Sequence, residues 1–206
     1  MQGKLVCAGA SGLFVAACAS APPEAAKRCD EVFVAAPPSG VMSVDTALSA
    51  ARARFYPELE AAPIRLIEKD LGPAVMFTAN LDLTTLERPP LERDYEIWLN
   101  PKLLEEPPSG RAVGAILTHE LKHILDYSKK DAQTLAAFAL WYAISDVSEY
   151  ERQTDEYALD LGCALGLSEY RSWLYEQIPA DAVEQKKREY YTPAEIEAYV
   201  DQSGTR

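Results

Sequence analysis

The stretch THELKHILDY, residues 118 to 127, contains both histidines of a chain of 206 residues. His119 and His123 stand four residues apart, and Glu120 directly follows the first of them. Apolar residues recur at steps of three and four from Arg111 onward, which predicts a helix. On a helix of 3.6 residues per turn the two histidines lie on one face, about 6 Å apart, so both imidazoles can bind one cation.

The H-E-x-x-H order of His119, Glu120 and His123 indicates a zinc site with hydrolytic chemistry. Zinc lowers the pKa of the water that it binds, and the adjacent carboxylate takes that water's proton as the water attacks a carbonyl. The alternative is a chance match, with one histidine in the core and the other solvated beside Lys122. Because the motif takes both histidines of a histidine-poor chain and its flanks are apolar, we expect metal binding.

A catalytic zinc site needs a third protein ligand, and since no histidine remains, this ligand must be a carboxylate. The segment EYERQTDEYA, residues 149 to 158, resembles the second motif of the gluzincin zinc metallopeptidases, in which a ligand glutamate precedes an aspartate by four residues. The resemblance implies Glu151 as the ligand and Asp155 as the acceptor that orients a zinc-bound histidine. Helical periodicity also favours Glu151 over Glu149 and Glu156, because it places Glu151 and Asp155 on one face.

The resemblance covers roughly residues 95 to 162 and implies a zinc metalloendopeptidase that acts on peptides or proteins, with Glu120 as general base. Its extension E-x-x-x-D-x-x-A is closest to the membrane-associated and periplasmic branch, which includes the heat-shock membrane proteases. It also implies that YEIWLN, residues 95 to 100, pairs with the substrate backbone. Without a third histidine, a tyrosine such as Tyr150 or Tyr157, or an arginine, would stabilise the oxyanion. The rival hypothesis is a noncatalytic zinc-binding envelope module that uses the fold for interaction.

Short apolar or alternating runs predict a small sheet of about three strands, at residues 63–68, 74–81 and 95–100. The rest of the chain has helical periodicity, so we expect an α+β domain with several helices packed on this sheet. The length is sufficient for one core of ordinary size.

Several helix boundaries can be predicted from local signals. Ser43 is the expected N-cap of a first helix. A later helix over residues 132–166 is long enough to be two, and Gly162 and Gly166 mark where it weakens. TPAE at residues 192 to 195 has the order of a capping box, which predicts a helix start at Thr192.

The first twenty residues predict an export signal, because a lysine is followed by an apolar small-residue segment and a small-residue exit. VAAC at residues 15 to 18 resembles the bacterial lipobox, in which cleavage leaves a lipid-bearing cysteine at the new N-terminus. The resemblance implies a signal peptide over 1–17 and a protein anchored to a membrane through Cys18, facing the periplasm of a bacterial envelope. Cleavage after Ala19 or Ala21, which would free a soluble secreted protein, is the alternative.

An Ala- and Pro-rich stretch follows, which predicts a tether over residues 18–40 and a metallopeptidase-like domain over 41–206. Cys7 lies in the expected signal and Cys18 would carry lipid, so Cys29 and Cys163 remain. In an oxidising periplasm these two would form a disulfide, and otherwise they would be small buried hydrophobes.

The chain is acidic, with 20 Lys and Arg against 32 Asp and Glu and a formal net charge of -12. Phosphate backbones attract proteins of the opposite sign, so the composition argues against a nucleic-acid partner. No sequence feature predicts the oligomeric state.

Overall fold

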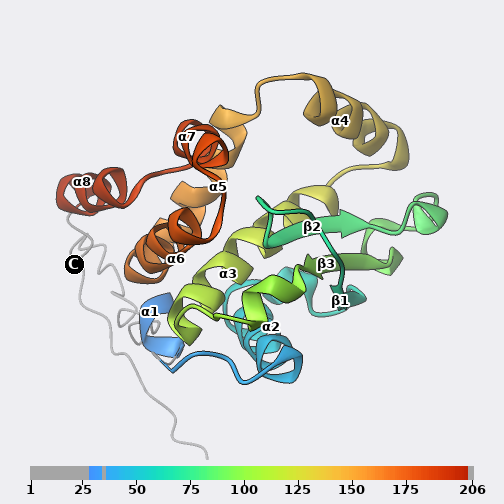
Figure 1. The fold of residues 1–206 in the computed structure, drawn as a ribbon. Helices are drawn as coiled ribbons and strands as arrows, with labels where there is room; N and C mark the ends of the chain where they lie inside the picture. The colour runs from blue at the N-terminus through green and yellow to red at the C-terminus, as the bar shows by residue number, and fades with distance from the viewer. Residues whose placement is uncertain (1–27, 34–35, 204–206) are drawn as a thin grey trace, which may run out of the picture.

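The computed structural model of the chain describes residues 28–33 and 36–203, and its fold is the predicted α+β class (Figure 1). The sheet has three strands, one in each predicted segment: β1 (Ile64–Glu68), β2 (Phe77–Leu81) and β3 (Tyr95–Leu99). Their order is β1-β3-β2, with β3 parallel to β1 and antiparallel to β2. The central strand is therefore the last of the three in the chain.

Alternation along the strands gives the sheet one buried face. In β3, Tyr95, Ile97 and Leu99 are buried while the residues between them are partly exposed. The antiparallel register places Phe77 opposite Leu99 and Ala79 opposite Ile97, so β2 adds two buried side chains to the same face. This period of two is what a half-buried sheet requires.

Helix α3 (Gly110–Tyr127) carries the H-E-x-x-H motif and lies at the centre of the molecule. Its N-cap Ser109 accepts a hydrogen bond from the Ala112 amide at 3.0 Å, which satisfies one of the free N–H groups of the first turn. It packs against β2 and against the helices α1 (Cys29–Val32), α2 (Val41–Phe55), α5 (Ser148–Asp160) and α6 (Ala164–Gln177). Because neighbours cover it on several sides, both histidines are buried.

Two predicted helix boundaries were wrong. Helix α2 begins at Val41 with Gly40 as N-cap, and the Ser43 hydroxyl donates to the Gly40 carbonyl at 2.8 Å instead of capping. The segment 132–166 forms parts of three helices, because α4 (Ala132–Ile144) ends before a short connection. There, Asp146 accepts a hydrogen bond from the Ser148 amide at 2.9 Å, which helps to start α5 in a new direction.

The two glycines of that segment have different roles. Gly162 ends α5 with a φ of 80°, a left-handed conformation that glycine adopts at low cost, as predicted for a weak point. Gly166 instead lies inside α6, where a Cβ atom would come within 2.6 Å of the Arg111 carbonyl oxygen and 2.7 Å of the Ala115 Cβ. Because Gly166 has no side chain, α6 can approach α3 closely.

The expected disulfide is present: Cys29 and Cys163 are bonded, with their Cα atoms 4.8 Å apart. It ties α1 to the start of α6, and Cys29 is fully buried. Cys29 is therefore packed into the domain, although it lies inside the segment predicted as the tether. The predicted signal peptide and Cys18 lie outside the described residues. In the described ranges no helix is both long enough and apolar enough to cross a membrane.

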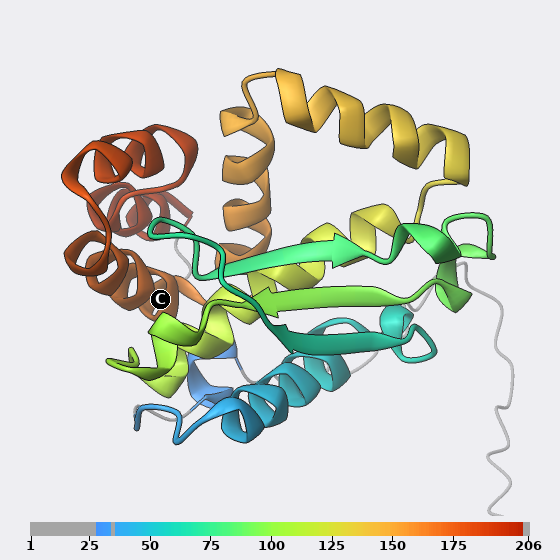
Figure 2. The ribbon, with the colours of Figure 1, turned by 45° about the vertical axis from the view of Figure 1, so that its right-hand side comes forward.

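The chain ends with α7 (Ala180–Glu189) and α8 (Pro193–Ser203). The capping box is confirmed: the Glu195 carboxylate accepts from the Thr192 amide at 2.8 Å, and the Thr192 hydroxyl accepts from the Glu195 amide at 3.3 Å. Figures 1 and 2 show α4 standing apart from the other helices, beyond β2.

Candidate metal centre

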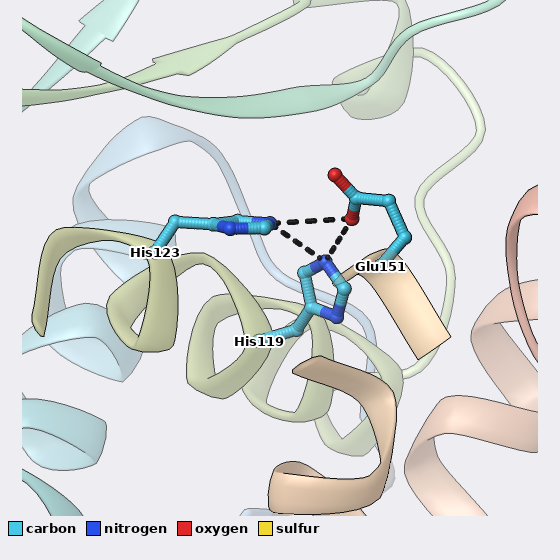
Figure 3. A group of neighbouring side chains, drawn as sticks. All are labelled: His119, His123 and Glu151. Atoms are coloured by element: carbon cyan, nitrogen blue, oxygen red, sulfur yellow. Dashed lines mark hydrogen bonds and ion pairs between the residues drawn. The ribbon is translucent and has the colours of Figure 1, made fainter. Parts of the chain in front are cut away.

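Three ligand atoms from two helices meet at one point. His119 and His123 project from α3, and Glu151 projects from the first turn of the facing α5 (Figure 3). The two Nε2 atoms are 3.1 Å apart, and Glu151 Oε2 lies 3.2 Å from that of His119 and 3.3 Å from that of His123. All three residues are buried, so the sequence motif and the resemblance select groups that the fold does bring together.

This triangle has the size of one face of a zinc coordination shell. Tetrahedral ligands at about 2.0–2.1 Å from zinc are separated from one another by roughly 3.3 Å. The three observed separations, 3.1 to 3.3 Å, match that value. The residues therefore fit a cation with three protein ligands and one open position.

The outer nitrogen of His119 is held by an acidic residue, as the resemblance implied. His119 Nδ1 lies 2.8 Å from Asp155 Oδ1, a short contact that is not aligned as an ideal hydrogen bond. Asp155 is itself fixed by the Arg171 guanidinium, at 2.9 and 3.2 Å, and by the Tyr191 amide at 3.0 Å. A proton on Nδ1 leaves the Nε2 lone pair of His119 directed at the other two ligand atoms.

His123 has an outer partner of a different kind. Its Nδ1 lies 3.0 Å from the Tyr150 hydroxyl, which lies 3.2 Å from Asp126 Oδ2. If the hydroxyl donates to the carboxylate, its oxygen accepts from Nδ1–H, and the Nε2 of His123 is again a lone pair. The lone pairs of His119 Nε2, His123 Nε2 and Glu151 Oε2 then converge. They repel one another unless a cation or a proton lies between them.

The charges around the cluster attract positive charge. Burial disfavours a charged His119, but the carboxylates of Asp155 and Glu151 prevail and raise its pKa to about 9. Burial likewise disfavours a charged Glu151, yet the two histidines hold its pKa well below the usual range. Glu151 is therefore an anion at neutral pH, as a metal ligand must be.

Glu120 is beside the cluster but is not part of it. Its Oε2 accepts a hydrogen bond from the Ala79 amide of β2 at 2.7 Å, and its side chain is 6% exposed. Among the described residues none is hydrogen bonded to Oε1. One oxygen of the carboxylate, Oε2, is thus held against the sheet. The other, Oε1, is available for chemistry at the cluster.

The cluster opens into a cleft of about 1110 Å³ between β2 and α4. His119, His123 and Glu151 line it together with Glu120, so the open coordination position and the candidate base share one space. Much of the remaining lining is apolar and comes from β2, from the turn that follows it and from α4. These residues are Phe77, Leu81, Leu83, Leu135, Phe138 and Ala139.

The two tyrosines named as oxyanion candidates do not line the cleft, whereas an arginine does. Tyr150 holds His123 from outside the cluster, and Tyr157 packs 6.0 Å from the ring of Tyr56. Arg171 lines the cleft and is paired with Asp155. Tyr142 and Tyr190 do line the cleft, and the Tyr142 hydroxyl donates to Glu151 Oε1 at 2.5 Å. No local pattern in the sequence could have singled out these two tyrosines.

The strand predicted to pair with substrate was also wrong. Residues 95–100 contain β3, which is hydrogen bonded to β1 on one side and β2 on the other, so its edges are not available. The edge strand beside the cleft is β2.

Asp155→Asn is expected to weaken metal binding by about 10- to 100-fold, because the amide orients His119 less well than the carboxylate does. Competition with a chromogenic chelator measures the affinity, and circular dichroism verifies that the variant is folded. Asp160→Asn, at the exposed end of the same helix, is the matched control and should bind like the unmodified protein. Equal affinity for the Asp155 variant would show that Asp155 does not position the ligand.

Comparisons of the chain with protein families, with curated proteins and with solved structures found no match in any of the three. The geometry of the cluster itself therefore carries the functional argument.

Proposed function

We propose that this protein is a zinc-dependent peptidase. The observation that carries the proposal is the meeting of His119, His123 and Glu151 at tetrahedral spacing, with Glu120 in the same cleft. Three ligands with an open position are typical of catalytic zinc, whereas structural zinc is bound by four protein groups.

Zinc held by these ligands supplies Lewis-acid chemistry, which polarises a peptide carbonyl and makes water nucleophilic at neutral pH. Glu120 takes a proton from the attacking water and returns it to the amine that leaves. The Ala79 amide supports this role because it anchors one carboxylate oxygen at 2.7 Å and so limits the orientation of the other. Asp155 orients His119, and the Tyr142 hydroxyl orients Glu151.

The edge of β2 provides a place for the substrate backbone. In the antiparallel pair, the Met76 carbonyl and the Asp82 amide are directed toward β3. The Ala79 amide is directed away from β3. The same alternation turns the backbone groups of Phe77 and Leu81 away from β3. An extended peptide can pair with these groups as an added strand, next to Glu120 and the metal ligands.

The cleft supports a peptide rather than a small metabolite. At about 1110 Å³ it exceeds the volume of most small-molecule pockets, and its walls on β2 and α4 combine apolar side chains with the polar Thr78 and Asn80. The oxyanion is stabilised in this proposal by Tyr190, which lines the cleft beside the ring of His119, because the one hydroxyl proton of Tyr142 is already donated to Glu151. The expected export signal and the lipid on Cys18 place the activity in a bacterial envelope, facing the periplasm.

The test is loss and recovery of activity with metal. Purified protein should contain about one zinc per chain by elemental analysis and should cleave an unstructured reporter protein such as casein. A chelator should remove both the metal and the cleavage, and added zinc should restore both. Full cleavage by metal-free protein would contradict the proposal, and bound zinc without cleavage of any peptide would favour the noncatalytic module.

A further inference from the structure

Helix α4 has a composition unlike that of the other helices. Residues 132–145 contain no charged residue, although Asp and Glu make up 32 of the chain's 206 residues. Apolar side chains occur on every side of the helix rather than along one stripe. A helix that is apolar all round is normally buried on all sides, in a protein core or in lipid.

Among the residues that the structure describes, neighbours cover only one side of α4. Leu135 is buried, and Phe138 packs on the rings of Tyr127 and Tyr150. On the opposite side Leu140 is 64% exposed and Ile144, one turn further along, is 76% exposed. Figures 1 and 2 show α4 at the margin of the described fold.

A tryptophan borders this apolar face. Trp141 is 38% exposed, at the same end of the helix as Leu140 and Ile144, whereas the Tyr142 hydroxyl is turned toward Glu151. Trp and Tyr combine a large apolar ring with a polar group, which suits the boundary between lipid headgroups and acyl chains. Leu140, Trp141 and Ile144 together are called the α4 patch below.

We propose that the α4 patch inserts into the surface of a lipid bilayer. A second copy of the chain fits less well, because a stable interface buries about 800 Å² per partner, and three exposed side chains supply much less than that. A bilayer requires no matching surface and accepts a small apolar insertion. The stretch 132–145, between Asp131 and Asp146, also carries no carboxylate of its own that anionic headgroups would repel.

The N-terminal sequence favours the same occupant. Ten residues separate Cys18, the expected lipid attachment point, from Cys29, which is packed into the domain. An extended segment of that length spans at most about 35 Å, so the anchor would keep the domain close to a bilayer at all times. Because the anchor holds the domain near the bilayer, the α4 patch meets lipid at a high effective concentration. A patch of only a few side chains can then bind. The inference does not depend on whether the metal centre is catalytic.

The test reads the depth of Trp141 itself. Full-length protein is mixed with vesicles of phosphatidylethanolamine and phosphatidylglycerol whose acyl chains are brominated or unmodified. The emission of Trp141 is obtained by subtracting the Trp141→Phe spectrum, because Trp98 and Trp173 remain in both proteins. Bromine quenches only rings that reach the acyl chains, so an N-terminal anchor alone does not produce the signal.

We expect the Trp141 emission to shift to shorter wavelength and to be quenched by the brominated lipids. The double variant Leu140→Gln and Ile144→Gln should lose the quenching and partition about tenfold or more weakly, since two exposed apolar side chains no longer enter lipid. Leu165→Gln is the matched control, because Leu165 is 49% exposed on α6, far from α4 in the fold, and it should behave like the unmodified protein.

Two outcomes would overturn the inference. One is vesicle-bound protein whose Trp141 emission is not quenched, which would leave only the N-terminal anchor in contact with lipid. The other is a dimer in light scattering that the Leu140 and Ile144 substitutions dissociate, which would make the α4 patch an interface between two copies.

Discussion

Glu120→Gln is expected to lower kcat for peptide hydrolysis by about 10²- to 10⁴-fold, the usual contribution of a positioned general base. The amide of glutamine cannot take a proton from water, but its oxygen can still accept the hydrogen bond from the Ala79 amide that Glu120 accepts at 2.7 Å. The fold around the cleft should therefore be kept. Single-turnover kinetics with saturating enzyme measure the chemical step, and elemental analysis measures the metal.

The metal content of the Glu120 variant distinguishes loss of the base from loss of the metal. Because Glu120 is not among the three clustered ligands, the variant should keep about one zinc per chain. Glu149→Gln, an exposed residue on α5, is a control that should change neither rate nor metal content. Unchanged hydrolysis by the Glu120 variant would remove this residue from the mechanism.

Glu151→Ala should weaken zinc binding by more than about a hundredfold, and peptide hydrolysis should fall with it. Loss of a direct ligand costs more than loss of an outer partner, which typically costs 10- to 100-fold. The remaining Nε2 atoms of His119 and His123, 3.1 Å apart, would hold the ion from one side only. Isothermal titration calorimetry with zinc measures the change.

The matched control for Glu151 is Glu149→Ala, two residues earlier on the same helix. Glu149 is exposed and hydrogen bonds to Gln153 at 3.3 Å, so its replacement should leave zinc affinity unchanged. Glu156 is separated from the cluster as well, since it accepts a hydrogen bond from the Tyr191 hydroxyl. Loss of zinc from the Glu149 variant together with retention by the Glu151 variant would reverse the assignment.

Both motifs of the metal centre could be predicted because each is local. The spacing of His119 and His123 places their side chains on one face of any regular helix, whatever surrounds it. The spacing of Glu151 and Asp155 does the same on a second helix. That the two helices face each other was implied only by the resemblance, and packing of α3 against α5 brings it about.

Contacts between distant segments could not be predicted in this way. The resemblance implied that the strand before the motif, Tyr95–Leu99, pairs with substrate, but the sheet places that strand in the centre and β2 at the cleft. Periodicity describes which face of a strand is buried and contains no information about its neighbours. Tyr142, Tyr150 and Arg171 reach the centre for the same reason, through packing that no spacing rule describes.

The sequence alone therefore determined which groups helical spacing brings together: two imidazoles and a carboxylate within one helical turn, and an acidic pair on one face of a second helix. Backbone periodicity is sufficient for these, because it relates residues within a few positions, and the Cys29–Cys163 disulfide is one of the few pairs that four cysteines allow. Tertiary structure decided which strand edge faces the metal ligands, which hydroxyls hold them, and that an uncharged helix is left half-exposed over the cleft. Those features depend on the packing of the whole domain around α3, where burial of many side chains at once selects one arrangement.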